Sequence, residues 1–262
     1  MRADRARPPS AFVVLAGLGA ALVVLPLLGL ILRAPWSSAG SGLTSDRTLQ
    51  AVRLSLEVSV SAATIALVLG FPLAWILART SFPGRRLLRA LVILPLVMPP
   101  VVGGVGLLTA FGRRGLVGTP LHALGVTLPF STAGAVLAAT FVSFPLMVIA
   151  AEAGLNSLDP RIEGAAEVMG ASRTYAIRHV TIPILLPQIA AGLVLTWARA
   201  LGEFGATITF AGNLQGRTQT LPLAVFEAGQ TDSGMAILIS LLLVGLSLGA
   251  LVALRGRILG AP

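Results

Sequence analysis

Six stretches of this 262-residue chain carry no Asp, Glu, Arg or Lys over about the length that crosses a lipid bilayer. A membrane-spanning helix needs about 20 apolar residues to cross about 30 Å of hydrocarbon. A charged residue near the bilayer centre costs at least about 2.5 kcal/mol on insertion scales. The stretches are residues 11–32, 58–78, 90–112 and 131–151, a fifth that starts near 182, and a sixth at about 233–254. We therefore predict an all-α polytopic membrane protein with six transmembrane helices.

The composition agrees with a lipid environment. Hydrophobic residues make up 55% of the chain and charged residues only 11%, whereas globular domains are roughly 25% charged. All 19 basic residues are Arg, and they lie mainly between the apolar stretches. We attribute the net charge of +9 to loops that orient the protein in the membrane, and not to nucleic-acid binding. The absence of Cys excludes a disulfide, a thiolate metal site and a thiol nucleophile.

The arginines predict the orientation. Arg199 lies inside the fifth helix; of the other 18, twelve lie on one side of the predicted helices and six on the other, and the richer side is expected to be cytoplasmic. Both termini and the polar segment 152–181 then face the cytoplasm. We divide the chain into an N-terminal tail, anchor helix and external linker (1–50), a transmembrane core (51–254) and a cytoplasmic tail (255–262). The first apolar stretch is 22 residues long, which favours an uncleaved anchor because signal-peptide apolar regions are about 7 to 15 residues long.

The third stretch contains residues that interrupt helices. Prolines and glycines gather there at Pro95, Pro99, Pro100, Gly103, Gly104 and Gly106. They predict a kinked or broken helix, and they leave open whether the bend belongs to a moving gate or to packing.

The segment 152–181 reads as two short helices. Asp159 suits an N-cap and Pro160 the first helical position, and Gly170 is a typical residue after a helix end. Ser172 is a candidate cap for the second helix. Ile162, Ala166 and Met169 have the spacing of an apolar stripe on the first helix.

This segment resembles the EAA loop of ABC importer permeases. The carrying residues are Glu163-Gly-Ala-Ala-Glu-Val-Met-Gly170 and, nine residues later, Val180-Thr-Ile-Pro183. The sequence departs from the motif at Gly164, where the family has Glu, and Glu163 stands one residue early. The resemblance implies a type I importer permease fold and a loop at about 152–183 that docks into a groove on an ATP-hydrolysing subunit. The implied coupling residues are Arg161, Glu163, Gly164, Ala165, Ala166, Glu167, Gly170, Arg173 and Pro183. The alternative is a helix lying on lipid headgroups, although such helices favour basic residues over the two Glu found here.

A second segment resembles the molybdate and tungstate branch of these permeases. It runs from Trp197 through Ala-Leu-Gly-Glu-Phe-Gly-Ala-Thr to Gly-Asn213, and then Arg217-Thr-Gln-Thr-Leu-Pro222. Sulfate permeases are similar but more divergent in this segment, so sulfate, thiosulfate and tungstate remain alternative cargoes. The resemblance implies a homodimer in a bacterial plasma membrane that imports molybdate. The implied partners are two ATPase subunits and an external oxyanion-binding protein.

The chain itself is predicted to be non-catalytic and to bind no cofactor or metal. A phosphate-binding loop of the Gly-x-x-x-x-Gly-Lys-Ser/Thr type requires Lys, and the chain has none. ATP and Mg²⁺ are therefore expected on the partner ATPase. A membrane-embedded enzyme and a channel or secondary transporter working alone are the alternatives from other classes. The enzyme would need clustered catalytic residues that the sequence lacks, and a lone channel would not need the docking loop.

Arg199 and Glu203 are four residues apart and opposite in charge, so we predict an ion pair within the membrane. We favour a structural or gating tie over a contact with substrate, because Glu203 would repel a divalent oxyanion. Nearby small residues in 202–212 suit close helix packing, with exposure of backbone amides to an anion as the alternative. Candidates for lining the pathway are Thr207, Thr209 and Asn213.

Overall fold

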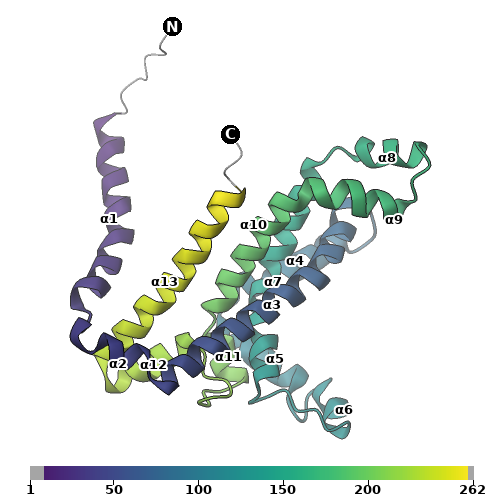
Figure 1. The fold of residues 1–262 in the computed structure, drawn as a ribbon. Coiled ribbons are helices and arrows are strands. Elements are labelled where there is room, and N and C mark those ends of the chain that lie inside the picture. The colour runs from purple at the N-terminus through teal and green to yellow at the C-terminus, as the bar shows by residue number, and fades with distance from the viewer. Residues whose placement is uncertain (1–8, 259–262) are drawn as a thin grey trace.

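The computed structural model (Figure 1) describes residues 9–258, and it describes only the backbone of Pro160, Glu163, Glu167, Arg173 and residues 253–258. Within that part of the chain the structure consists of helices and contains no strand. Five helices are long and apolar enough to cross a membrane, and a bent pair of shorter helices makes a sixth when it is counted as one span. The predicted all-α architecture with six spans is therefore confirmed.

The long helices are α1 (Ser10–Arg33), α3 (Asp46–Arg79), α7 (Thr132–Ser157), α10 (Ile182–Leu201) and α13 (Ser233–Ile258). The bent pair is α4 (Arg85–Val97) and α5 (Pro100–Phe111). The short elements are η1 (Trp36–Ser38), α2 (Ala39–Leu43), α6 (Gly118–Ala123), α8 (Pro160–Val168), α9 (Arg173–Ala176), the π-helical η2 (Ile177–Thr181), α11 (Gly205–Phe210) and α12 (Leu221–Thr231).

The second span differs from its prediction at the start. Helix α3 begins at Asp46, inside the segment predicted to be an external linker, because Ser45 caps it and its side chain accepts a hydrogen bond from the Thr48 amide at 3.4 Å. The remainder of that linker is also ordered locally, as η1 and α2. A good N-cap thus extends the helix past the charged residues that bounded the apolar stretch.

The third span is not one continuous helix over 90–112, so that part of the layout is wrong. Helices α4 and α5 meet at an angle of 119° across Met98 and Pro99. Pro100 occupies the first turn of α5, and the residue before a proline disfavours helical backbone angles. The kink predicted from these prolines is confirmed, and the bend is large enough to send the two halves in different directions.

The centre of the fold is formed by α3, α7 and α10. One buried cluster joins them through Leu77, Met147, Leu155 and Leu185, with Leu88 and Val92 of α4 packed against it. Close approach depends on small residues, as is typical of membrane helices. A Cβ atom added at Gly192 of α10 would lie 2.5 Å from the Ala150 Cβ of α7.

Helix α1 stands apart from this core. None of its residues is buried, and its apolar side chains are exposed along its whole length. It meets the rest of the chain chiefly at α13, and Figure 1 shows the two helices diverging from a shared lower end. A helix that is hydrophobic all round and unburied is suited to contact with lipid.

The short elements gather at two opposite ends of the molecule (Figure 1). Helices α8 and α9 lie toward the same end as the start of α1 and the end of α13, which we call the loop end. Helices α2, α6 and α12 lie toward the other end, which we call the far end. The EAA loop is therefore at the same end as the start of α1 and the end of α13, as six alternating spans require.

Candidate functional site

Within the EAA loop (residues 152–183), α7 continues to Ser157, beyond its predicted end at Ala151. The two short helices that the capping residues predict follow it as α8 and α9. The Arg161 amide donates a hydrogen bond to Asp159 Oδ1 at 2.9 Å, and the Tyr175 amide donates to Ser172 Oγ at 3.3 Å. Gly170 follows α8 with a φ of +89°, in the left-handed region that glycine adopts without strain. Both predicted caps and the glycine stop are confirmed.

Most of the loop's described side chains are exposed. Ala166 is buried, Gly164 is half-buried, and Arg161, Ala165, Gly170 and Pro183 are exposed. The side chains of Glu163, Glu167 and Arg173 lie outside the described residues. Of the apolar stripe, only Ala166 is covered, whereas Met169 is 83% exposed and Val168 beside it 89%.

A hollow of about 600 Å³ lies between the two short helices. It is lined by Ala166, Met169, Gly170, Ala171, Ser172, Tyr175 and Val180. Tyr175 stacks on His179 with ring centroids 4.1 Å apart, which holds one edge of this surface. An exposed apolar hollow at the end of a loop is suited to contact with another protein.

The second candidate site is the turn between α10 and α11. Arg199 Nη1 lies 2.7 Å from Glu203 Oε2, so the predicted pair forms. It does not form along one continuous helix, because α10 ends at Leu201 and Glu203 lies in the turn that follows. The Glu203 side chain is 2% exposed and that of Arg199 is 32% exposed.

The Glu203 carboxylate has a second role that its spacing from Arg199 did not reveal. Its other oxygen, Oε1, accepts a hydrogen bond from the Ala206 amide at 2.8 Å, in the first turn of α11. That amide would otherwise lack a partner at the helix start. Glu203 thus joins the end of α10 to the start of α11 and at the same time neutralises the charge of Arg199.

Small residues of α11 are used for packing against α5. A Cβ atom added at Gly205 would lie 2.7 Å from Pro100 Cβ, and one added at Gly104 would lie 2.5 Å from Thr209 Cβ. Ala206 and Phe210 are fully buried. The packing interpretation of this segment is therefore confirmed.

The three residues predicted as pathway-lining candidates lie in different surroundings. Thr207 is 1% exposed and is covered by the chain itself. The Thr209 hydroxyl donates to the Gly205 carbonyl at 2.8 Å within α11. Asn213 Nδ2 donates to Glu227 Oε2 at 3.0 Å, at the far end of the molecule.

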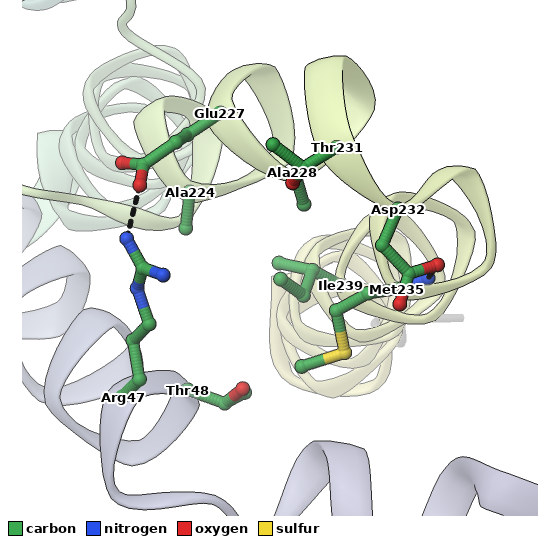
Figure 2. Close-up of a pocket in the computed structure, with 9 residues that line it drawn as sticks. All are labelled: Arg47, Thr48, Ala224, Glu227, Ala228, Thr231, Asp232, Met235 and Ile239. Carbon is green, nitrogen blue, oxygen red and sulfur yellow. Dashed lines mark hydrogen bonds and ion pairs between the residues drawn. The ribbon is translucent and has the colours of Figure 1, made fainter.

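Glu227 of α12 is the centre of a polar cluster that sequence reasoning missed. Besides Asn213, Gln219 donates to Oε2 and Arg47 pairs with Oε1. Figure 2 shows Arg47 of α3 reaching across to Glu227 at the edge of a cavity of about 210 Å³, with Asp232 on another side. Arg47 and Glu227 are 180 residues apart, so no spacing signal could have paired them.

Comparison with known proteins finds a matching family model over residues 66–260, described as the binding-protein-dependent transport system inner membrane component. The molybdenum transport system permease protein ModB of Mycobacterium tuberculosis is 44% identical over 226 residues, which are 86% of this chain and 86% of that protein. ModB of Escherichia coli K12 is 48% identical over 191 residues, covering 72% and 83%. The sulfate transport system permease protein CysT of Salmonella typhimurium is 34% identical over 208 residues, covering 78% and 75%.

Solved structures share the fold at low sequence identity. A bacterial alginate ABC transporter, in complex with an alginate pentasaccharide-bound periplasmic protein, contains a chain that matches with a TM-score of 0.73 at 19% identity, covering 94% of this chain and 93% of that one. A chain of the MetNI methionine ABC transporter, in an inward-facing conformation, matches with a TM-score of 0.64 at 17% identity, covering 83% and 99%. These likenesses show the type I importer permease fold.

Proposed function

Because this chain belongs to the family of binding-protein-dependent transport system inner membrane components, we propose that it forms the membrane pathway of an ATP-driven molybdate importer. The assignment of the cargo depends on the identity to the two ModB proteins, 44% and 48% over most of the chain, against 34% to a sulfate permease. The same family places the protein in the plasma membrane as a multi-pass component.

The proposed assembly contains two copies of this chain, two ATPase subunits and an external oxyanion-binding protein. The exposed Val168 and Met169 and the hollow beside Gly170 support docking of the ATPase at the loop end. We place both termini in the cytoplasm, since twelve of the arginines counted outside the spans lie on that side and the EAA loop shares the end with α1 and α13. The chain supplies no catalytic residue and binds no cofactor; ATP and Mg²⁺ are bound and hydrolysed by the partner.

We assign Arg199 and Glu203 to a structural or gating tie in this pathway, and not to a substrate site. Both oxygens of the Glu203 carboxylate already accept hydrogen bonds within the chain, one from Arg199 and one from the Ala206 amide. The carboxylate is therefore engaged in the protein's own structure and not in binding cargo. Among the pathway candidates, Thr209 and Asn213 are partly accessible, and the burial of Thr207 removes it from direct contact with cargo. Hydroxyl and amide groups suit a pathway that must bind an oxyanion weakly enough to release it.

Uptake of labelled molybdate by cells with and without this gene tests the proposal. Excess sulfate and excess tungstate serve as competitors, and a Gly170→Trp variant, expected to insert into the membrane but to bind the ATPase weakly, tests whether uptake depends on docking. Loss of uptake on deletion, with no competition by sulfate, is the expected result. Intact molybdate uptake together with lost sulfate uptake would instead assign sulfate as the cargo.

A further inference from the structure

A two-pronged ion pair joins α4 to α7 near the loop end. Arg89 Nε donates to Glu152 Oε2 at 3.3 Å, and Arg89 Nη2 pairs with Glu152 Oε1. The Glu152 side chain is 12% exposed and that of Arg89 is 36% exposed. Arginine can hold both oxygens of a carboxylate at once, which fixes relative direction as well as distance.

Two further hydrogen bonds tie the same place to the end of α3. Arg89 Nη2 donates to the Leu77 carbonyl at 3.4 Å, and Arg79 Nη2 donates to the Leu158 carbonyl at 3.2 Å. Leu77 and Leu158 also belong to the buried cluster beneath. We call Leu77, Arg79, Arg89, Glu152 and Leu158 the loop-end clamp.

The clamp lies where the EAA loop leaves the membrane helices. Helix α7 continues from Glu152 to Ser157, and Leu158 and Asp159 lead directly into α8. Because α7 is one helix from Glu152 to Ser157, a displacement of α8 that reaches the end of α7 through Leu158 and Asp159 is carried on to Glu152. Arg89 would pass that displacement on to α4.

Helix α4 is connected to α11 through α5, the second half of the bent pair. Helix α4 ends at Val97 and turns by 119° into α5. Pro100 and Gly104 of α5 lie so close to Gly205 and Thr209 of α11 that no added Cβ atom fits between them. Movement of the bent pair therefore has to move α11 or break this packing, because closely packed contacts do not deform gradually.

We propose that Arg89 and Glu152 are positioning residues that transmit movement of the EAA loop from α7 to the bent pair α4–α5, and through it to α11. This inference rests on the proposed function, in which ATP hydrolysis by a partner drives the loop. The pair itself touches neither cargo nor nucleotide. Its loss should lower the amount of molybdate transported per ATP hydrolysed while leaving ATPase binding in place.

The test uses the full complex of permease, ATPase and binding protein in proteoliposomes. The variants are Arg89→Gln, Glu152→Gln and the charge exchange Arg89→Glu/Glu152→Arg. Arg86→Gln is the matched control, because Arg86 is an exposed arginine on the same helix. Three quantities are measured: yield of the ATPase complex, ATP hydrolysis, and molybdate transported per ATP.

Each single variant is expected to keep the complex yield and to lower transport per ATP at least about fivefold, the lower range for coupling between two sites. The charge exchange should restore the molybdate transported per ATP to at least half of the value of the unmodified protein. Arg86→Gln should leave this value unchanged. An unchanged ratio in both single variants would overturn the inference. Loss of the complex in the single variants without rescue by the exchange would also overturn it, because that pattern indicates a role in folding alone.

A second measurement does not depend on the cargo. The chain has no Cys, so nitroxide labels can be placed at Val105→Cys on α5 and at Leu248→Cys on α13, a helix outside the clamp. Both positions are exposed. The inference expects ATP to change the distance between these labels in the unmodified complex and in the charge exchange, but not in Arg89→Gln. No ATP-dependent change in the unmodified complex would refute transmission through the clamp. Failure to transport molybdate with this distance change intact would instead count against the proposed cargo.

Discussion

Two ion pairs among the described residues, Arg199–Glu203 and Arg89–Glu152, differ in what they hold together. Arg199 and Glu203 are four residues apart, and the carboxylate divides its oxygens between the guanidinium and the Ala206 amide. Arg89 and Glu152 are 63 residues apart, and both carboxylate oxygens go to one guanidinium. The first pair closes a turn, whereas the second joins two helices. Loss of the Arg199–Glu203 pair should therefore lower the stability of the protein. Loss of the Arg89–Glu152 pair should mainly lower the coupling between ATP hydrolysis and transport.

Burial sharpens this difference. Glu203 is 2% exposed, so removing Arg199 would leave a charge with almost no access to water. Breaking a buried pair by removing one partner is strongly destabilising. Arg89 is 36% exposed, so it can turn to solvent when Glu152 is neutralised. The cost of breaking the second pair should be smaller for that reason.

The largest effect is expected from Arg199→Ala. It strands the Glu203 carboxylate, and the expected loss of stability is about 3–5 kcal/mol. Thermal unfolding of the purified protein in detergent measures it. Arg199→Ala/Glu203→Ala should be less damaging than Arg199→Ala to both assembly and transport, even though it also removes the acceptor for the Ala206 amide. Equal damage from the single and double changes would remove the case for pairing.

Gly170→Trp separates attachment of the ATPase from transmission through the loop-end clamp. No described atom lies within 4 Å of a Cβ added at Gly170, so a bulky side chain there occupies open space at the surface of the hollow. The protein should stay in the membrane while its affinity for the ATPase falls about tenfold, or ~1.4 kcal/mol. Co-purification and titration of the ATPase measure this.

Gly170→Ala is the matched control, since it meets the same strain at φ +89° without the bulk. Complex yield and transport that are the same for Gly170→Trp and the parent protein would refute docking at this surface.

Glu152→Gln should cost only about 1 kcal/mol in stability, because the partner Arg89 can reach water. The same thermal unfolding measurement, made beside that of Arg199→Ala, tests the contrast directly. If Glu152→Gln lowered stability as much as Arg199→Ala does, both ion pairs would have a mainly structural role, and the difference proposed between them would be wrong.

The smallest effect is expected at Glu227, whose side chain is 37% exposed and whose partner Arg47 is 51% exposed. Glu227→Gln should change stability by about 0.5 kcal/mol or less, as is usual for exposed pairs. It provides the baseline for the other two pairs in the same unfolding assay. A destabilisation above about 2 kcal/mol would mean that the cluster with Asn213 and Gln219 is cooperative.

The sequence predicted the features that depend on near neighbours. Hydropathy located the spans, Asp159 and Ser172 located the helix starts of the EAA loop, and Pro99 and Pro100 located the break in the third span. It did not predict the 119° angle of that break, because the angle depends on what α4 and α5 pack against.

The long-range polar contacts were out of reach for the same reason. Glu152 belonged to a polar segment and Arg89 to a loop counted only for its charge, and nothing in their spacing joins them across 63 residues. Glu203 was paired correctly with Arg199, but its bond to Ala206 required knowing that α10 ends at Leu201. Local periodicity does not encode such partners; the packing of α4 against α7 brings Arg89 and Glu152 together, and the end of α10 brings Glu203 to Ala206.

The isolation of α1 has a consequence for how the protein is made. With none of its residues buried, α1 needs no other part of the chain to complete its surface, and it can enter the bilayer as soon as it leaves the ribosome. The bent pair α4–α5 is different, since α7 and α11 cover it and are synthesised later. We expect protease protection of ribosome-bound truncations to show early insertion of α1 and delayed settling of α4–α5. Membrane insertion would then begin with a helix that needs no partner, and the bent pair α4–α5 would reach its final position only after α7 and α11 have been synthesised.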